Sequence, residues 1–389
     1  MSTVIVSYAR TPFVRFSGVF RDVAAHTLGG HAVTAALAAA RLDPGAVDYL
    51  LAGQVLQAGA GQNPARQTAV AAGIPLTVPA MTLNAVCLSG MEAVVAAHRL
   101  IASGEARIVV AVGQESMSLA PHALVGSRKG TSYGSATLID TVEHDGLTDA
   151  FERRSMGLST DALNEGLGIT REEQDAFAAA SHTRLTAAEQ FLAGEIAPFT
   201  VSGRSPVVVE HDDGVRPDTT PESLARLRAA FRDGGTITAG NASQISDGAA
   251  ALVVADEAFA IEQGLPILAR IVAHAMVAGP DVSLHSQPSA AIRRALALAD
   301  RAVGDLGAVE INEAFAAVGV QSTRDLDIDP SLVNANGGAI ALGHPIGASG
   351  ARIVGHLARR LDELGSGALG AAAICGGGGQ GSAIVLQVP

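Results

Sequence analysis

The alternation of apolar and polar residues along the chain predicts an α/β fold. Residues 3–11 and 47–56 have the continuous apolar character of buried strands, and the Ala-rich pattern of residues 25–42 between them is typical of a helix. Residues 81–90 then begin with an apolar strand, followed by a helix over 91–104 and a strand over 106–113. Strands that alternate with helices in this way indicate buried sheets covered by helices.

The texture changes between about residues 118 and 238. Residues 120–146 are polar and rich in turn-forming residues, residues 170–196 have the pattern of one amphipathic helix, and residues 215–231 resemble a loop that leads into a short helix. This stretch predicts an insertion or cap rather than further strand–helix units.

The first part of the chain recurs near its end. The order helix, loop and strand around residues 42–59 returns at 289–319, and the order Asn, loop, helix, Gly, strand, Gly-Gln of 83–117 returns in 333–381 with a longer loop. The offset of about 250 residues is too long for a solenoid. We therefore expect two similar halves, residues 1–117 with 239–265 and residues 266–389, around an inserted domain at 118–238. Facing halves would bring their loops together at one cleft.

Composition narrows the class of protein. Of the 389 residues 48% are hydrophobic and 16% are charged, so the chain can bury a large core and is not expected to be disordered. The net charge of −12 argues against a nucleic acid or an anionic membrane as partner. No apolar run approaches a membrane span, and no signal peptide or peroxisomal tripeptide is recognisable, so we expect a cytoplasmic protein.

Only two cysteines occur, Cys87 and Cys375. They have no zinc-ligand spacing, which predicts no metal site, and a disulfide is disfavoured in a reducing compartment. They are either inert buried thiols or catalytic ones. Cys87 lies between a strand and a helix, where the helix dipole is expected to lower its pKa; a core cysteine at a strand end is the alternative.

Three further features could carry chemistry. His344, between Gly343 and a proline, suits a base that activates a thiol or a donor to an oxyanion, or else a turn histidine held by backbone bonds. Asn312 interrupts an apolar run, where it could cap a helix or hold a water. Cys375 begins "CGGGGQG", a run that exposes backbone N–H groups able to stabilise an oxyanion. A dehydrogenase is unsupported because no phosphate-binding fingerprint occurs.

Taken together, these segments resemble the thiolase family of acyl-CoA C-acyltransferases over essentially the whole chain. The motifs "NAVCLSG", "GQESMS", "GLTDAF", "TAGNASQISDGAAA", "NEAFA", "NGGAIALGHPIGASGAR" and "CGGGGQG" follow the order and spacing of that family. The resemblance implies two halves stacked as a five-layer α/β/α/β/α sandwich with an inserted loop domain. It also implies a homo-oligomer, here a tetramer built from two dimers that are joined through residues 120–146.

The resemblance assigns a role to each reactive residue. Cys87 would attack a thioester or 3-ketoacyl carbonyl, and His344 would accept its proton and then donate to the substrate oxygen together with a water held by Asn312. Cys375 would be the acid and base at the α-carbon. The N–H groups of Cys87 and Gly377 would form a second oxyanion hole.

Coenzyme A and acyl-CoA are the implied co-substrates, with no tightly bound cofactor. Ser243 matches a pantetheine contact, Arg216 matches a contact to the nucleotide end or is a surface charge, and Met156 matches a residue of the acyl pocket. Ser155 stands where many relatives have His, and "SLHSQPS", with Ser286 and Gln287, replaces the pantetheine-loop "GxGP". Gly376 also departs from the family's apolar residue.

The implied reaction is reversible Claisen condensation of acetyl-CoA with acyl-CoA, or thiolysis of 3-ketoacyl-CoA as in fatty acid β-oxidation. Two alternatives remain. A ketoacyl-synthase-type condensing enzyme would lack a second catalytic cysteine, and Cys375 counts against it. A thiolase-like acyl-CoA or lipid binder with little turnover is the other.

Overall fold

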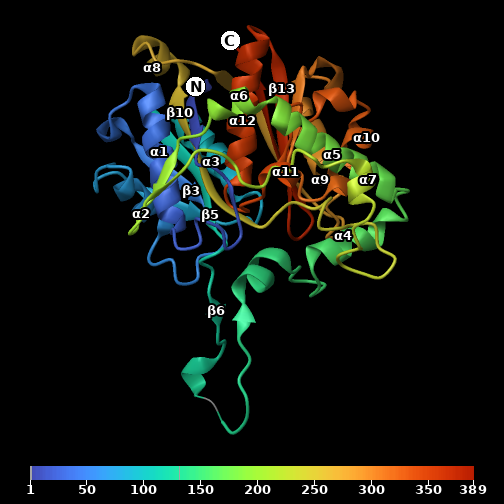
Figure 1. The fold of residues 1–389 in the computed structure, drawn as a ribbon. Coiled ribbons are helices and arrows are strands. Elements are labelled where there is room, and N and C mark those ends of the chain that lie inside the picture. The colour runs from blue at the N-terminus through green and yellow to red at the C-terminus, as the bar shows by residue number, and fades with distance from the viewer. Residues whose placement is uncertain (1, 131) are drawn as a thin grey trace.

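The computed structural model describes residues 2–130 and 132–389. Two halves with the same order of elements lie side by side in it (Figure 1). The N-terminal half consists of β1 (Thr3–Arg10), α1 (Ala25–Ala40), β3 (Tyr49–Gly53), α2 (Pro64–Ala71), β4 (Ala80–Leu83), α3 (Ser89–Ala102), β5 (Ile108–Ser116) and β10 (Ser246–Asp256). The C-terminal half consists of β11 (Ala269–Ala278), α9 (Gln287–Leu298), β12 (Ala308–Ile311), α10 (Ala316–Leu326), α12 (Ser349–Leu364), β13 (Leu369–Gly376) and β14 (Gln380–Gln387).

The strand orders of the two halves match. They are β4-β3-β5-β10-β1 and β12-β13-β14-β11, with parallel pairs at the β4 and β12 ends and antiparallel pairs elsewhere. A single parallel bridge between Val309 and Val333 takes the place of β4 in the second half. The expected duplication is therefore present in the backbone.

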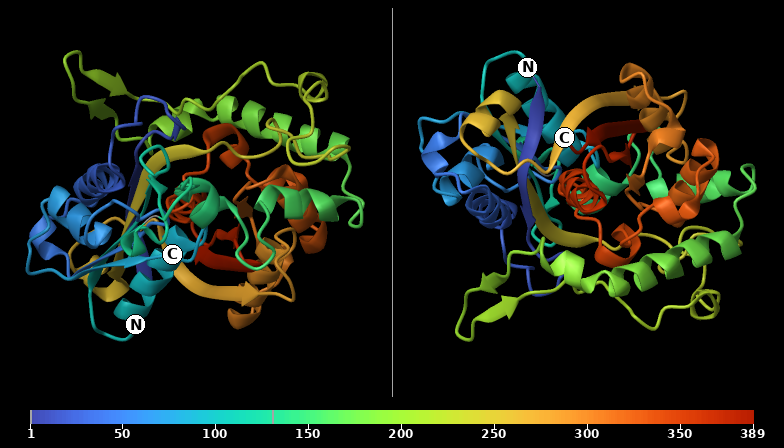
Figure 2. Two further views of the ribbon diagram at one scale, coloured as in Figure 1. Left: turned by 90° about the horizontal axis from the view of Figure 1, so that it is seen from below. Right: turned by 90° about the horizontal axis from the view of Figure 1, so that it is seen from above.

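Five layers result from this arrangement. Helices α1 and α2 cover the outer face of the first sheet, α9 and α10 cover that of the second, and α3 and α12 lie between the sheets (Figure 2). The predicted five-layer α/β/α/β/α sandwich is confirmed. One feature was not expected: Thr3–Ile5 of β1 also pairs with Ala269–Ile271 of β11, so hydrogen bonds join the two sheets at one edge.

The two central helices touch at their N-terminal ends. Each begins with a Ser-Gly pair, Ser89-Gly90 in α3 and Ser349-Gly350 in α12. A Cβ on Gly90 would lie 2.7 Å from the carbonyl oxygen of Gly347, and one on Gly350 would lie 2.4 Å from the backbone nitrogen of Met91. Only glycine permits this approach, which brings the loops before both helices to one place.

The inserted segment runs along one side of the sandwich and sends out an arm (Figure 1). The arm carries a two-stranded ribbon of β6 and β7 and projects from the body. The elements of the insertion are β6 (His122–Ala123), η2 (Ser127–Lys129), β7 (Ile139–Asp140), η3 (Val142–Leu147), α4 (Met156–Asn164), α5 (Arg171–Ala187), α6 (Glu189–Ala193), β8 (Phe199–Val201), β9 (Val207–Val209) and α7 (Pro221–Leu224).

The single helix predicted over residues 170–196 is wrong. The chain turns at Ala188, between α5 and α6, although neither Gly nor Pro marks the position. Shortly after α6 the buried Glu195 pairs with Arg10 of β1 and with His356 of α12. These long-range ion pairs fix the path of the chain more strongly than local helix propensity does.

Short elements complete the fold. They are β2 (Val14–Arg15), η1 (Pro44–Ala46), α8 (Glu257–Glu262), η4 (Val303–Asp305), η5 (Pro330–Leu332) and α11 (Ala339–Leu342). Within the described residues, every helix is too short or too polar to cross a bilayer.

Candidate active site

A cavity of about 630 Å³ lies where the N-terminal ends of α3 and α12 meet. Seven of the residues selected from the sequence line it: Cys87, Met156, Arg216, Ser243, His344, Cys375 and Gly377. Asn312 is not part of the wall but lies behind His344, in contact with it. Residues far apart in the chain are thus brought to one place.

Cys87 occupies a tight turn that ends in α3. The preceding Val86 has a φ of 52°, in the left-handed region that a β-branched residue rarely adopts. Asn84 accepts a hydrogen bond from the N–H of Val86, and the Ser89 hydroxyl donates to the carbonyl of the same residue. Strain of this kind costs about 1–3 kcal/mol and persists where the surroundings fix it. The turn therefore holds the Cys87 thiol at the cavity wall.

The expectation that the helix dipole lowers the pKa of Cys87 is wrong. Burial raises the pKa of this thiol to about 12, although the backbone N–H groups of Gly377 and of Cys87 itself oppose the shift. The side chain is almost wholly enclosed. Loss of hydration destabilises the thiolate more than the two N–H groups stabilise it. Cys87 is a neutral thiol in the free site.

His344 is held in one tautomer by its neighbours. The Ser349 hydroxyl lies 3.1 Å from the carbonyl of Pro345, to which it donates, and 2.6 Å from Nδ1 of His344. Because its one proton is used, the hydroxyl accepts from Nδ1–H, which leaves Nε2 with a free electron pair. Burial, with a smaller contribution from Arg352, lowers the pKa of His344 to about 3. The ring is a neutral base.

Asn312 stands beside that nitrogen. Its Nδ2 lies 3.4 Å from Nε2 of His344, to which it can donate, and its backbone N–H donates to the carbonyl of Ala373 in β13. The amide is fully buried, and among the described residues its Oδ1 has no hydrogen-bond donor. Asn312 is therefore positioned by the sheet rather than as a helix cap.

Cys375 lies near the end of β13 and lines the same cavity as Cys87. Burial raises the pKa of its thiol above its ordinary range, and the nearby Cys87 adds to the shift. The departure at Gly376 has a steric cause, since a Cβ there would lie 2.8 Å from Cγ of Leu88. Leu88 directly follows Cys87, so a larger residue at 376 would press on the turn that carries Cys87.

The residues selected for coenzyme A all line the cavity. The Ser243 hydroxyl donates to the carbonyl of Ala314 at 3.1 Å and can still accept a bond. Arg216 is exposed, and its backbone N–H donates to Nδ1 of the buried His182. Met156 begins α4, with its sulfur 3.3 Å from the position a Cβ on Gly377 would take.

The structure shows where two departures from the family pattern lie relative to the cavity. Ser155 lines the cavity and caps α4, accepting from the N–H of Leu158. In the "SLHSQPS" segment only Leu284 reaches the cavity wall, whereas the Gln287 side chain donates to the carbonyl of Gly279. The changed positions Ser286 and Gln287 therefore do not touch the cavity directly.

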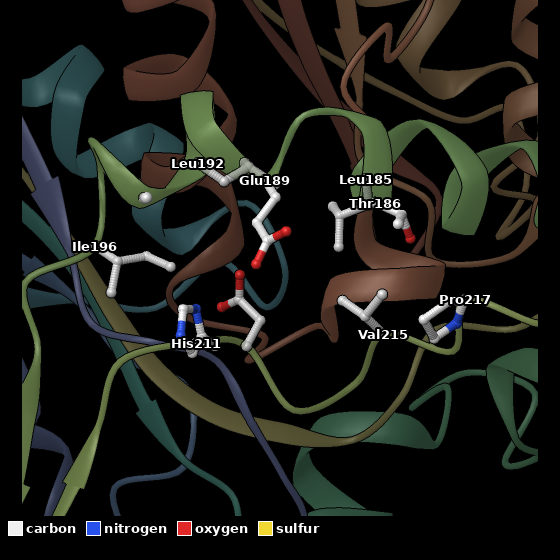
Figure 3. Close-up of a pocket in the computed structure, with 10 residues that line it drawn as sticks. Leu185, Thr186, Glu189, Leu192, Ile196, His211, Val215 and Pro217 are labelled. Carbon is white, nitrogen blue, oxygen red and sulfur yellow. The ribbon is translucent and has the colours of Figure 1, made fainter.

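A smaller cavity of about 180 Å³ lies behind the segment that carries Arg216 (Figure 3). Val215 and Pro217 line it on one side, while Leu185 and Glu189 approach from α5 and α6. It contains none of the residues selected from the sequence. The residues selected from the sequence therefore line or adjoin the larger cavity.

Sequence reasoning missed two residues that shape the site. Ser349 fixes the His344 ring, and only its place in the duplicated Ser-Gly helix start could have pointed to it. The fully buried Glu115 accepts hydrogen bonds from the N–H groups of Val55, Leu56 and Gly347. It lies in the "GQESMS" motif. A carboxylate at the end of an apolar strand is unusual, and this could have marked Glu115 as a candidate site residue.

Comparison with known proteins agrees with this geometry. The family profile of the thiolase N-terminal domain matches residues 3–258, and that of the thiolase C-terminal domain matches residues 265–388. A probable acetyl-CoA acetyltransferase of Mycolicibacterium smegmatis is 51% identical over 388 residues, which cover 99% of this chain and 100% of the relative. The acetyl-CoA acetyltransferase of Pseudomonas aeruginosa is 46% identical over 387 residues, which cover 98% of both.

Solved structures show the same fold. Human mitochondrial 3-ketoacyl-CoA thiolase superimposes with a TM-score of 0.95 at 37% identity, over 100% of this chain and 99% of that one. The Acat5 thiolase of Ascaris suum, solved in complex with coenzyme A, gives 0.94 at 37% identity over the whole of both chains. Domain matches, full-length relatives and fold agree, and the chain belongs to the thiolase family.

Proposed function

We infer that this chain is a CoA-dependent acyltransferase of the thiolase type, and we propose that the acyl group passes through Cys87. One observation carries the assignment of residues: two buried thiols and a neutral imidazole line the same cavity. An acyl-enzyme divides a difficult carbon–carbon exchange into two easier steps.

In the first step the Cys87 sulfur attacks either the carbonyl carbon of a thioester or the carbonyl carbon C3 of a 3-ketoacyl-CoA. Nε2 of His344 accepts the thiol proton as the new carbon–sulfur bond forms. The N–H groups of Cys87 and Gly377 both lie close enough to the Cys87 sulfur to lower its pKa. They are therefore available as donors to an oxygen on a carbon attached to that sulfur. This arrangement suits a second oxyanion hole over the acyl-enzyme.

Cys375 supplies the proton for carbon. In thiolysis the C2–C3 bond breaks, its electron pair moves to C2, and the Cys375 thiol protonates that carbon. In condensation a first acetyl-CoA acylates Cys87 as its bond to the CoA sulfur breaks, and the departing CoA thiolate then takes the Cys375 proton. The Cys375 thiolate removes a proton from C2 of a second acetyl-CoA, and the resulting enolate attacks the acyl carbon and releases Cys87. His344 and a water on Oδ1 of Asn312 would donate to the thioester oxygen of the enolate.

Acetyl-CoA and acetoacetyl-CoA are the proposed substrates, because the full-length relatives are named acetyl-CoA acetyltransferases. Ser243 and Arg216 are proposed to contact the pantetheine and nucleotide parts of coenzyme A, and Met156 the acyl end. Residues 118–238 are proposed as a loop domain between halves 1–117 with 239–265 and 266–389. We also propose a cytoplasmic tetramer, active in fatty acid metabolism including β-oxidation.

The roles of the two thiols can be separated by experiment. Wild-type protein should cleave acetoacetyl-CoA in the presence of CoA, with loss of the 3-ketoacyl absorbance. Cys375→Ser should lose this cleavage by several orders of magnitude yet still accept an acetyl group from acetyl-CoA on Cys87. Retained cleavage in Cys375→Ser would contradict the assignment of the carbon acid and base.

A further inference from the structure

A buried polar cluster joins three separate parts of the cavity wall from behind. We name Asp161, Asn164, Thr236 and His285 the wall cluster. Asp161 and Asn164 belong to α4, Thr236 follows the segment that carries Phe231, and His285 lies next to Leu284 in the "SLHSQPS" segment. The three parts come from the insertion and from the C-terminal half.

The hydrogen bonds of the wall cluster run in one direction. Nδ2 of Asn164 donates to Oγ1 of Thr236 at 2.9 Å, so the amide oxygen is the acceptor that faces Nε2 of His285, also at 2.9 Å. Thr236 in turn donates its hydroxyl proton and its backbone N–H to Oδ1 of Asp161, at 3.1 and 2.8 Å. His285 is thus the first donor and Asp161 the last acceptor of one connected chain.

Three of the four members of the wall cluster are closed to water. Asp161 and Asn164 are completely buried and His285 is 2% exposed, whereas Thr236 is half-buried. Nδ1 of His285 is buried and has no hydrogen-bond partner among the described residues. The side chain is therefore held through Nε2. The backbone carbonyl of His285 accepts from the Ser322 hydroxyl of α10 at 2.8 Å, which fixes the main chain. Buried polar groups of this kind resist displacement, because each broken bond leaves an unpaired group without solvent.

Each member of the wall cluster is linked to a residue that lines the cavity. Met156 and Asn164 are the first and last residues of α4. Leu284 precedes His285 and belongs to one apolar cluster with Cys375 and Met156. The Phe231 ring covers Gly157, where a Cβ would lie 2.2 Å from Cζ of the ring. Movement of Met156, Phe231 or Leu284 away from the cavity would therefore strain the wall cluster.

We propose that the wall cluster fixes the position of Met156, Phe231 and Leu284 and thereby limits the acyl chain length that the enzyme accepts, with His285 as the positioning residue. The proposal rests on the proposed function, because the acyl group must lie between Cys87 and Cys375. His285 touches no part of the cavity itself and acts through Leu284 and α4.

Acyl selectivity distinguishes this role from a purely structural one. A structural contribution alone would lower activity equally for all substrates, whereas a loosened wall favours the longer chain. The test compares kcat/KM for acetoacetyl-CoA and for 3-ketooctanoyl-CoA in wild type and in His285→Phe, which keeps a ring and removes the donor. Loss of the donor should raise the ratio of long-chain to short-chain kcat/KM about fivefold, the factor that corresponds to one buried hydrogen bond.

Two further variants make the result decisive. Thr236→Val keeps the shape of the side chain and interrupts the chain of bonds one step further on, so it should shift the ratio in the same direction even if His285→Phe does not fold. His274→Phe is the matched control, since His274 is a half-buried histidine that faces His98 outside the cavity. Its ratio should equal that of wild type.

The possible outcomes distinguish a failure of the proposed function from a failure of the role proposed for the wall cluster. If wild type cleaves neither substrate, the proposed function fails. If wild type cleaves acetoacetyl-CoA and the ratio stays within about twofold in both cluster variants, the wall cluster does not set chain length and this inference is wrong.

Discussion

Burial dominates the electrostatics of Cys87 and His344. The pKa of the thiol is raised to about 12 by burial, and the pKa of the imidazole is lowered to about 3, first by burial and then by Arg352. At neutral pH the free site therefore contains a thiol and a neutral base rather than an ion pair. Proton transfer from Cys87 to His344 must accompany attack on the substrate.

A pH series of thiol alkylation tests this protonation state. The reactive form is the thiolate, whose fraction rises tenfold per pH unit as long as the pH is below the thiol pKa. The rate at which iodoacetamide modifies Cys87, measured in a Cys375→Ser background, should therefore rise steadily between pH 6 and 9. A plateau below pH 8 would show a thiolate–imidazolium pair instead.

Single residues were predicted unevenly from the sequence. Cys87, His344 and Cys375 could be selected because reactive side chains beside small or turn-forming residues have few structural explanations. The pKa values of these side chains could not be predicted from the sequence, because their burial depends on residues from both halves. Ser349 acts on His344 five positions earlier, and only its place in the repeated Ser-Gly helix start pointed to it. The wall cluster acts through contacts across the fold, for which local sequence holds no signal.

At the level of elements, Glu115 couples strand β5 to two loops. Its carboxylate accepts from Val55 and Leu56 after β3 and from Gly347 after His344. Burial raises the pKa of Glu115 to about 7, although these backbone N–H groups oppose the shift and Asp247 adds to it. The ionised form can accept all three bonds, whereas protonation turns one oxygen into a donor.

The position of the His344 loop should therefore depend on pH. We expect kcat/KM to fall as the pH drops through about 7, since the active form is the carboxylate. Glu115→Gln should be about tenfold less active at pH 8, because an amide places a donor against an N–H, and should lose this acid limb. Glu105→Gln, at an exposed glutamate, is the control. An unchanged pH profile in Glu115→Gln would contradict this role.

Elements with a strong pattern were predictable, and irregular ones were not. The duplicated halves were visible because each strand and helix repeats its apolar pattern in the same order. The turn at Ala188 and the pairing of β1 with β11 could not be predicted, because both depend on partners far away in the chain. Arg10 is such a partner for the segment after Ala188, and Ala269 is one for β1.

At the level of the whole molecule, a buried ion-pair group joins the insertion to the sandwich. Arg10 of β1 pairs with Glu195 and Asp212, and the side chains of Arg10 and Glu195 are fully buried. Burial opposes ionisation of Glu195, but His356 and Arg10 outweigh it and hold its pKa at about 2. Its contribution to stability is thus present above about pH 4.5 and is lost as the pH falls toward 2.

Removal of the Arg10 charge should destabilise the fold. Arg10→Met removes the cation that pairs with Asp212 and one partner of Glu195, which keeps His356 and Arg359. It is expected to lower the free energy of unfolding at pH 7 by about 3 kcal/mol. Urea titration measures the change, with Arg21→Met at an exposed pair expected to cost less than about 0.5 kcal/mol. Equal effects of the two variants would show that burial of the pair is unimportant.

The arm offers a test of the proposed tetramer. Val125, Tyr133 and Leu138 are exposed apolar residues of the arm, which suits a contact between subunits. Replacing all three with Ser should reduce the mass measured by light scattering from that of a tetramer to that of a dimer, with little change in activity per chain. A wild-type mass below that of a tetramer would contradict the proposal.

The central claim is that Cys87 carries the acyl group. The most direct measurement is intact-protein mass spectrometry after brief incubation with acetyl-CoA, followed by peptide mapping, in wild type and in Cys87→Ser. We expect one acetyl group per chain on Cys87, released when CoA is added, and neither adduct nor acetoacetyl-CoA cleavage in Cys87→Ser. An acetyl group on another residue, or turnover that survives in Cys87→Ser, would contradict it.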